Sequence, residues 1–91
     1  MSERGAWKII IHRKAEKILK RLDGDILKRV RQSIRDLGVD PRPLGHKKLT
    51  GYEDLYRVRV GDWRIIYAIE GDKLIVLVLE VSTRGGAYRD F

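Results

Sequence analysis

The 91-residue chain is strongly basic, with 20 Lys and Arg against 13 Asp and Glu and a formal net charge of +7. Its length supports one domain with a modest core, and the absence of cysteine excludes a disulfide framework, a thiolate metal site and a thiol nucleophile. A charge surplus of this size in a small domain is typical of proteins that bind polyanions such as nucleic acid, although solubility alone could account for it.

The sequence shows no sign of export or membrane insertion. The N-terminus lacks an apolar h-region, and no apolar run approaches the length that crosses a membrane. We therefore expect a soluble, cytoplasmic protein. The chain also has no Asn and a single Gln among many ionised residues, a composition that favours a thermophilic source.

The first half of the chain predicts a strand followed by two helices. Trp7–His12 alternates weakly and is rich in Ile, which favours a strand. The apolar spacing that follows predicts an amphipathic helix from Arg13, ended by an Asp-Gly pair. Asp25 is the candidate N-cap of a second helix that stops at Gly38. The inward positions of the two helices are Ala15, Ile18, Leu19, Leu22, Ile26, Leu27, Val30, Ile34 and Leu37.

The second half predicts three strands after an irregular connector. Two prolines exclude regular structure in Val39–His46. The strands are Leu55–Val60, Trp63–Glu70 and Lys73–Val81, and a Gly-Asp pair between consecutive strands predicts a two-residue hairpin turn at both junctions. The last strand is apolar on both faces, so we expect it inside the sheet. The whole chain is predicted to be a single α+β domain, an antiparallel sheet in β-α-α-β-β-β order with the helical hairpin packed on one face.

The first hairpin carries the functional signal. Its turn places Arg59 opposite Arg64 and Arg57 opposite Ile66, and because side chains alternate between faces, the three arginines share one face. Like charges directly opposite each other destabilise a sheet, and an anionic ligand would relieve that repulsion. The other face, which we expect beneath the helices, carries Val58, Val60, Ile65, Tyr67, Ile69, Val76 and Val78.

Three segments of the chain resemble the RelE/ParE superfamily of type II toxins. They are the Lys47–Gly51 lead-in, the Leu55–Tyr67 hairpin and the Val81–Tyr88 ending, and the resemblance covers essentially the whole chain. It implies a RelE-type mRNA interferase, which cleaves mRNA on the ribosome and needs no cofactor. The ParE-type branch instead inhibits DNA gyrase, and a third reading is an RNA-binding module that has lost catalysis.

For the RelE-type reading, the resemblance implies that the catalytic residues are Arg57, Arg59, Arg64, Arg84 and Tyr88. Attack by a ribose 2′-OH on the adjacent phosphate needs a proton acceptor, a stabiliser of the phosphorane and a proton donor. Guanidinium groups suit the second task but do not accept protons, and RelE-type enzymes commonly carry lysine where this chain has Arg57 and Arg59. Proton abstraction therefore falls to Tyr88 or to the ribosome, or has no efficient acceptor. Of these we favour Tyr88 as the base, with Arg84 stabilising the phosphate and proton donation through a water.

The position of Arg84 depends on the second hairpin. A two-residue turn there would place Val81 opposite Asp62 and bring the tail to the sheet end that carries the arginines. If the strand simply continued in regular alternation, however, the side chain of Arg84 would point to the helix-covered face. We therefore expect the glycines beside Arg84 to bend the tail round.

Less specific readings stay open at each of these positions. Arg57 and Arg59 could be solvated strand residues paired with Glu53 or Asp54, and Tyr88 could merely pack the tail onto the sheet. The two histidines have no Cys, Asp or Glu at ligand spacing, so no metal site is expected. A second basic surface could be solvated or could contact RNA phosphates on the ribosome; its residues are Lys14, Lys17, Lys20, Arg21, Lys28, Arg29, Lys47 and Lys48, with Arg35 on the same helical face.

The resemblance also implies partners. One is a cognate antitoxin with an acidic, amphipathic segment that folds on binding and covers the arginines. The others are the ribosome, through its rRNA, and mRNA.

Overall fold

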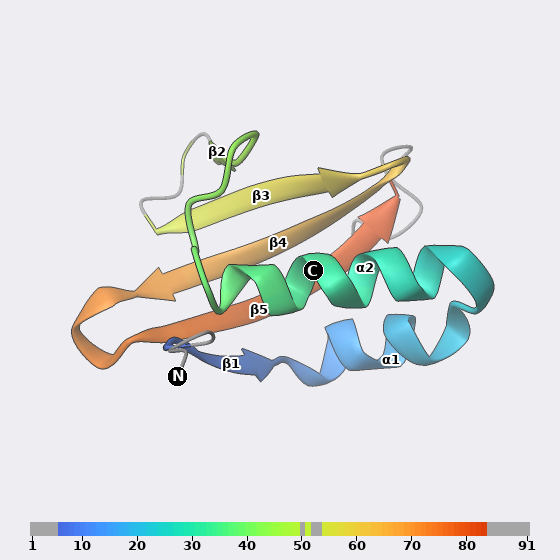
Figure 1. Cartoon of the computed structure of the whole chain (residues 1–91), viewed down its shortest axis with the longest axis horizontal. Coiled ribbons are helices and arrows are strands. Elements are labelled where there is room, and N and C mark those ends of the chain that lie inside the picture. The colour runs from blue at the N-terminus through green and yellow to red at the C-terminus, as the bar shows by residue number, and fades with distance from the viewer. Residues whose placement is uncertain (1–5, 50, 52–53, 84–91) are drawn as a thin grey trace.

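The computed structural model describes residues 6–49, 51 and 54–83 (Figure 1). Within these residues, the elements are β1 (Lys8–Ile11), α1 (Arg13–Arg21), α2 (Gly24–Leu37), β2 (Lys47–Lys48), β3 (Leu55–Val60), β4 (Trp63–Glu70), a 3-10 turn η1 (Gly71–Lys73) and β5 (Ile75–Thr83). They form one five-stranded sheet in the order β1-β5-β4-β3-β2. No helix in this described part is long and apolar enough to cross a membrane.

The predicted α+β class is confirmed, with a sheet that is mostly antiparallel. β2–β3, β3–β4 and β4–β5 are antiparallel pairs, whereas β1 runs parallel to β5. Hairpin turns fix the direction of consecutive strands, but nothing in the sequence pattern fixes the direction of β1 against a strand far along the chain. β5 lies between β1 and β4, inside the sheet as predicted.

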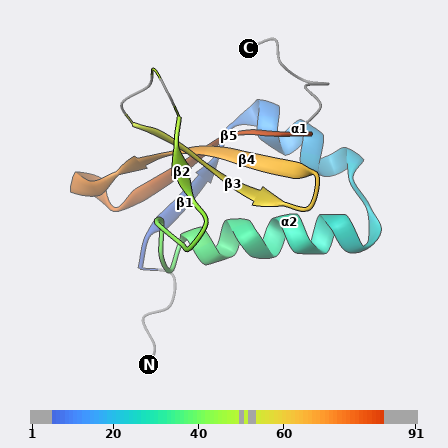
Figure 2. The same cartoon turned by 90° about the horizontal axis from the view of Figure 1, so that it is seen from above.

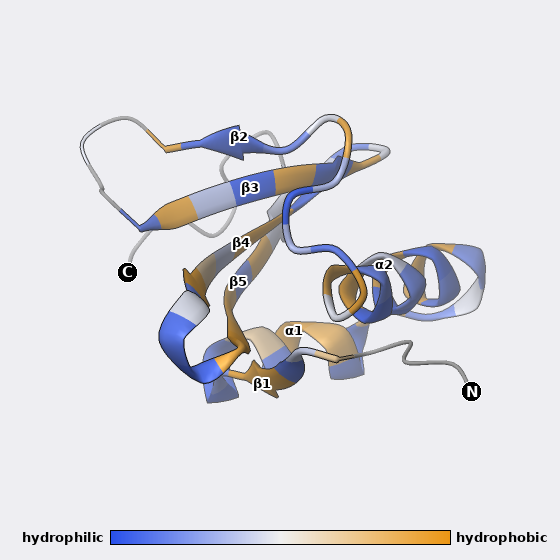
Figure 3. Ribbon diagram, turned by 60° about the vertical axis from the view of Figure 1, so that its left-hand side comes forward, coloured by the Kyte–Doolittle hydropathy of each residue, from blue (hydrophilic) through white to orange (hydrophobic). Residues whose placement is uncertain are grey.

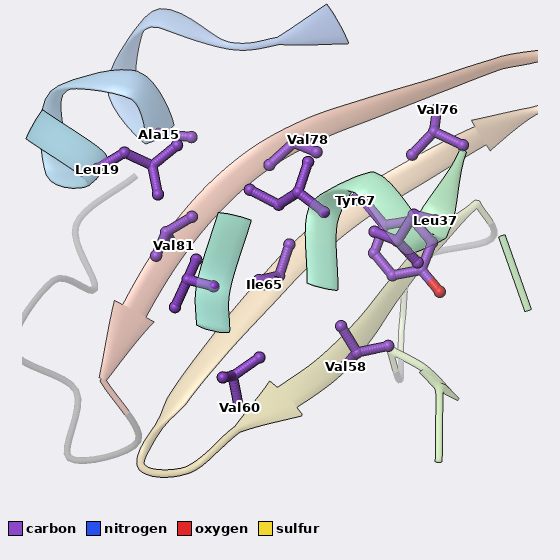
Figure 4. Packing of buried hydrophobic residues seen from close by; sticks show 12 residues of the cluster. Ala15, Leu19, Leu37, Val58, Val60, Ile65, Tyr67, Val76, Val78 and Val81 are labelled. Atoms are coloured by element: carbon purple, nitrogen blue, oxygen red, sulfur yellow. The ribbon is translucent and has the colours of Figure 1, made fainter. Parts of the chain in front are cut away.

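Both helices cover one face of the sheet. Figure 1 shows them antiparallel to one another, with α2 crossing β5, and Figure 2 shows α2 running along one side of the sheet. Figure 3 shows hydrophilic segments alternating with hydrophobic ones along β3, the pattern of a strand with one covered face. The buried side chains that join the two layers (Figure 4) are Ala15, Leu19, Val30, Ile34, Leu37, Val58, Val60, Ile65, Tyr67, Val76, Val78 and Val81.

The element boundaries are close to those predicted, and β3 and β4 match them. The N-cap predicted for the second helix is wrong: α2 begins at Gly24, with Asp23 at the N-cap position and Asp25 in the first turn. His12, predicted to end the first strand, instead caps α1, because its Nδ1 accepts a hydrogen bond of 3.0 Å from the backbone N–H of Lys14. The short strand β2 was not predicted.

The second hairpin differs from its prediction. The connection is the η1 turn followed by Leu74, whose φ of 55° places it in the left-handed region. This longer connection pairs Glu70 with Ile75, so the register is two residues away from the one that a two-residue turn gives. This shift and a bulge further along β5 together place Val81 opposite Ile65, and the predicted pairing of Val81 with Asp62 is wrong.

A β-bulge in β5 changes the side chains that face each side of the sheet. Tyr67 pairs with Val78 but the preceding residue, Ile66, pairs with Glu80, so Leu79 is an extra residue in β5. One extra residue reverses the alternation of everything that follows it. The argument that gave Arg84 the wrong parity assumed a strand without a bulge and no longer holds; Arg84 itself lies outside the described residues.

The connector between α2 and β2 is attached to the core by one buried hydrogen bond. The hydroxyl of Tyr67 donates to the carbonyl oxygen of Pro41 at 2.7 Å, and both residues are buried. Burial raises the pKa of Tyr67 to about 12, since the phenolate would lose hydration there. This bond fixes the segment that leads into Lys47 and Lys48.

Candidate nucleic-acid interface

The sheet face opposite the helices carries the predicted arginine cluster. Arg59 lies opposite Arg64 and Arg57 lies opposite Ile66, as predicted from the first turn. Gly61, with φ of 60°, adopts the left-handed conformation that this turn needs and that glycine accepts without a steric penalty. Arg59 is exposed, and Arg57 and Arg64 are half-buried, so one face of two adjacent strands presents three guanidinium groups.

The bulge adds two polar residues of β5 to this face. Glu80 lies opposite Ile66 and Ser82 lies opposite Arg64. The face therefore has two cross-strand rows, Arg57–Ile66–Glu80 and Arg59–Arg64–Ser82. Our sequence reasoning missed Glu80 and Ser82, because a regular ladder puts both on the helix-covered face. A signal was nevertheless present, since Glu80 is the one charged residue in the apolar run from Leu74 to Val81.

Three polar atoms on this face are buried without a partner in the described part of the chain. They are Nε of Arg64, Oε1 of Glu80 and Oγ of Ser82. Glu80 is 9% exposed and Ser82 is 1% exposed. A buried polar atom that makes no hydrogen bond costs about 1–3 kcal/mol, so the fold holds these atoms in place against a free-energy penalty.

An open groove of about 360 Å³ adjoins the arginine face. The C-terminal half of α2, the connector and β3 line it, and its basic residues are Lys47, Arg57 and Arg59. Lys47 of β2 pairs with Arg57 of β3. The groove is therefore continuous with the positive charge of the first row.

The eight lysines and arginines predicted for the second basic surface are all exposed. Six of them come from α1 and α2, and two form β2. The guanidinium group of Arg29 lies beside the turn between β3 and β4. Its Nη1 is 3.8 Å from the position that a Cβ on Gly61 would occupy. Arg31, which the prediction did not include, joins the two helices through an ion pair of 3.5 Å with Glu16.

Several predicted assignments fall outside the described residues. Arg84 and Tyr88 are among them, as is Glu53, so their proposed roles stay predictions. Tyr67 belongs to the core, as expected, and the half-buried Trp63 packs against that core. Within the described part, no cluster of three or more His, Cys, Asp or Glu side chains could hold a metal ion.

Comparisons with known proteins identify the family. The family model described as ParE toxin of type II toxin-antitoxin system, parDE, matches residues 9–88. RelE1 of Methanocaldococcus jannaschii is 33% identical over an alignment of 87 residues, and the alignment covers 92% of this chain and 97% of that protein. Toxin RelE3 of the same organism is 33% identical over an alignment of 72 residues, which covers 75% of this chain and 82% of that protein.

Solved structures show the same fold. A chain of the archaeal RelE–RelB complex from Pyrococcus horikoshii OT3 is 30% identical with a TM-score of 0.77, covering 89% of this chain and 98% of that one. A chain of the RelB–RelE antitoxin–toxin complex from Methanococcus jannaschii is 29% identical with a TM-score of 0.72, covering 90% of this chain and 98% of that one.

These matches span most of the chain and nearly all of each relative. The chain therefore belongs to the RelE/ParE superfamily of type II toxins, as its sequence motifs predicted. Its relatives with 30% identity or more place it, within that superfamily, among the toxins of the RelE family.

Proposed function

We propose that this toxin is a ribosome-dependent mRNA endoribonuclease that inhibits translation. In this reading a ribose 2′-OH attacks the adjacent phosphate while bound on the sheet face opposite the helices. Arg57, Arg59, Arg64 and Arg84 bind and stabilise the phosphate, and Tyr88 takes part in proton transfer. The RelE names of the relatives support this reading.

The observation that carries the proposal is the pairing of Arg59 with Arg64. Two cations directly opposite each other destabilise a sheet by about 0.2–1 kcal/mol. Arg59 and Arg64 form this pair on the face of the sheet that α1 and α2 leave uncovered. An RNA phosphate between them would be attracted by both charges, and guanidinium donors match the geometry of phosphate oxygens.

The second basic surface would supply affinity for the ribosome. Its eight exposed cations can contact rRNA phosphates without reading sequence, so binding would weaken steeply as salt rises. Arg29, beside the turn between β3 and β4, connects this surface to the arginine face. Binding through the helices would leave that face free for mRNA.

The proposed protein partner is a cognate antitoxin. Two structural relatives are complexes of RelE with RelB. An acidic segment that folds on this toxin would neutralise the arginine face, at the expense of the entropy lost on ordering. Its binding would block access to mRNA.

Two other functions have an observation in their favour. The matching family model carries the ParE name, which favours a gyrase inhibitor. Arg57 and Arg59 stand where RelE-type enzymes commonly carry lysines, which favours an RNA-binding module with weakened catalysis.

Mapping the 5′ ends of cellular RNA after induction separates the three functions. The endoribonuclease predicts growth arrest with new 5′ ends inside translated messages, and no cleavage of naked RNA by the purified toxin. The gyrase inhibitor predicts intact messages and loss of supercoiling by purified gyrase. The RNA-binding module predicts growth arrest with neither effect. Intact messages in arrested cells would overturn the proposed activity.

A further inference from the structure

Glu80 is the side chain whose position the proposed function does not explain. It belongs to an otherwise apolar stretch of β5, yet the bulge turns it to the arginine face, where it is 9% exposed. Ionised carboxylates are almost never buried without a compensating partner. Its Oε1 has no hydrogen-bond partner within the described part of the chain.

Around Glu80 lie hydrogen-bond donors and acceptors that are complementary to a ligand with one hydroxyl and one anionic oxygen. Nε of Arg64 can only donate a hydrogen bond, an ionised carboxylate can only accept one, and the hydroxyl of Ser82 can do both. Arg64 and Glu80 are diagonal neighbours on adjacent strands, a separation that long side chains can span. A ribonucleotide 3′-phosphate with its free 2′-OH presents a hydroxyl beside an anionic oxygen, and would satisfy all three atoms once the side chains that shield them from solvent turn aside.

On the basis of the endoribonuclease activity proposed above, we propose that Glu80 is the general base of the cleavage. Its carboxylate accepts the proton of the 2′-OH, and the 2′-oxygen forms a bond to the adjacent phosphorus. The bond from phosphorus to the 5′-oxygen breaks, and that oxygen leaves with a proton from water. The products are a 2′,3′-cyclic phosphate and a 5′-hydroxyl, while Nε of Arg64 and Oγ of Ser82 donate to the phosphate.

This assignment fills a role that the arginines cannot perform. Guanidinium groups at residues 57 and 59 do not accept protons, so a base has to come from another residue. The sequence alone led us to assign the role of base to Tyr88, because a strand without a bulge places Glu80 on the helix-covered face. Glu80 instead shares a cross-strand row with Arg57, two strands away, so the acceptor and the phosphate-binding cations are built into the same rigid sheet.

The test compares Glu80→Gln with wild-type toxin on programmed ribosomes, under single-turnover conditions. Glutamine keeps the shape of the side chain and cannot serve as the base. We expect the cleavage rate of bound mRNA to fall by about 100–10,000-fold, with the Kd for the ribosome unchanged. Glu70→Gln is the matched control, because Glu70 is exposed at the far end of β4 beside Lys73 and its substitution is expected to leave the rate unchanged.

A second substrate distinguishes a base from other roles. When sulfur replaces the 5′-bridging oxygen at the scissile bond, the leaving group needs no proton, so only defects in protonating the leaving group are rescued. Glu80→Gln is expected to stay as slow on this substrate as on the ordinary one. Rescue by sulfur would overturn the assignment, and so would a defect confined to the Kd, which would leave Glu80 as a residue that orients Arg64.

The remaining outcomes separate this inference from the proposed function. If the wild type cleaves and Glu80→Gln cleaves within threefold of it, the assignment of Glu80 fails alone. If the wild type does not cleave ribosome-bound mRNA, both fail. If Glu80→Gln does not fold, Glu80→Asp and Glu80→Ala replace it in the test. The Asp variant keeps a carboxylate on a side chain one methylene shorter, so it is expected to cleave faster than the Ala variant. Equal cleavage rates of the two folded variants would overturn the assignment.

Discussion

Arg64→Gln is expected to make the protein more stable and less active. Arg64 lies directly opposite Arg59, and removing one of two opposed like charges is expected to raise the free energy of unfolding by about 0.2–1 kcal/mol. The substitution also removes Nε, which is buried without a partner among the described residues. For a domain of this size, the gain corresponds to a rise in Tm of about 1–8 °C.

Thermal unfolding at low salt measures this change, with Lys8→Gln as the control. Lys8 is an exposed cation on β1 whose cross-strand neighbour is the apolar Ile75, so its removal relieves no opposed charge. The gain for Arg64→Gln is expected to vanish near 1 M salt, where the Debye length is about 3 Å. Inorganic phosphate is expected to raise the Tm of the wild type more than that of the variant.

The same variant tests the function of the pair. If Arg64 stabilises the developing charge on the phosphate, its loss is expected to slow cleavage by about 100–1,000-fold. A variant that is less stable than the wild type at low salt would refute the repulsion argument. It would show that packing of the arginine stem, or the attraction between Arg64 and the neighbouring Glu80 carboxylate, outweighs the opposed charge at this position.

Further predictions concern other parts of the chain. Tyr67→Phe is expected to lower the free energy of unfolding by about 1 kcal/mol at pH 7 in denaturant titrations, because the bond to the connector is lost. The pKa of Tyr67 is raised from 10.0 to about 12, so between pH 10 and 12 the unfolded chain loses the phenolic proton while the folded chain keeps it. The free energy of unfolding of the wild type is therefore expected to fall across this range. The Phe variant has no phenol and is expected to lack this contribution to the fall. Lys17→Ala with Lys28→Ala is expected to reduce the salt dependence of ribosome binding by about one unit of slope for each phosphate contact removed, and an unchanged slope would make this surface merely solvated. Arg84→Ala is expected to abolish growth arrest, and an unchanged Tm would show that the loss is one of activity rather than of folding. Tyr88→Phe removes only a hydroxyl and is expected to slow cleavage by impairing protonation of the leaving oxygen through water; a variant as toxic as the wild type would remove Tyr88 from the chemistry.

The parts of the fold that depend on local pattern were predictable from the sequence. Apolar spacing located both helices, and the Gly-Asp turn after Val60 set the register that brings Arg59 and Arg64 together. The same alternation identified the helix-covered face, and those side chains form the core. Each of these features is determined by residues a few positions apart.

Features that depend on distant parts of the chain were not predictable in the same way. The parallel direction of β1 is set by its pairing with β5, more than sixty residues away. The bond from Tyr67 to Pro41 joins a strand to a connector 26 residues earlier. The second Gly-Asp pair was misread because the same two residues can begin a 3-10 turn, and the left-handed Leu74 that completes it carries no sequence signal.

The bulge in β5 had the largest effect on the functional interpretation. A ladder without it places Glu80 among the helix-covered side chains, where a carboxylate would be costly and its function obscure. With Leu79 as the extra residue, Val81 completes the core opposite Ile65, and Glu80 and Ser82 turn toward the arginines. One inserted residue thus lets an apolar strand supply both packing for the helices and polar groups for the site. Bulges occur preferentially beside active sites for this reason, since they redirect side chains without changing the rest of the sheet. A regular strand that kept Leu79 would exchange these roles, burying a carboxylate under the helices and exposing Val81 beside Arg64, whereas deleting Leu79 would remove the bulge and leave Glu80 and Val81 on their present faces.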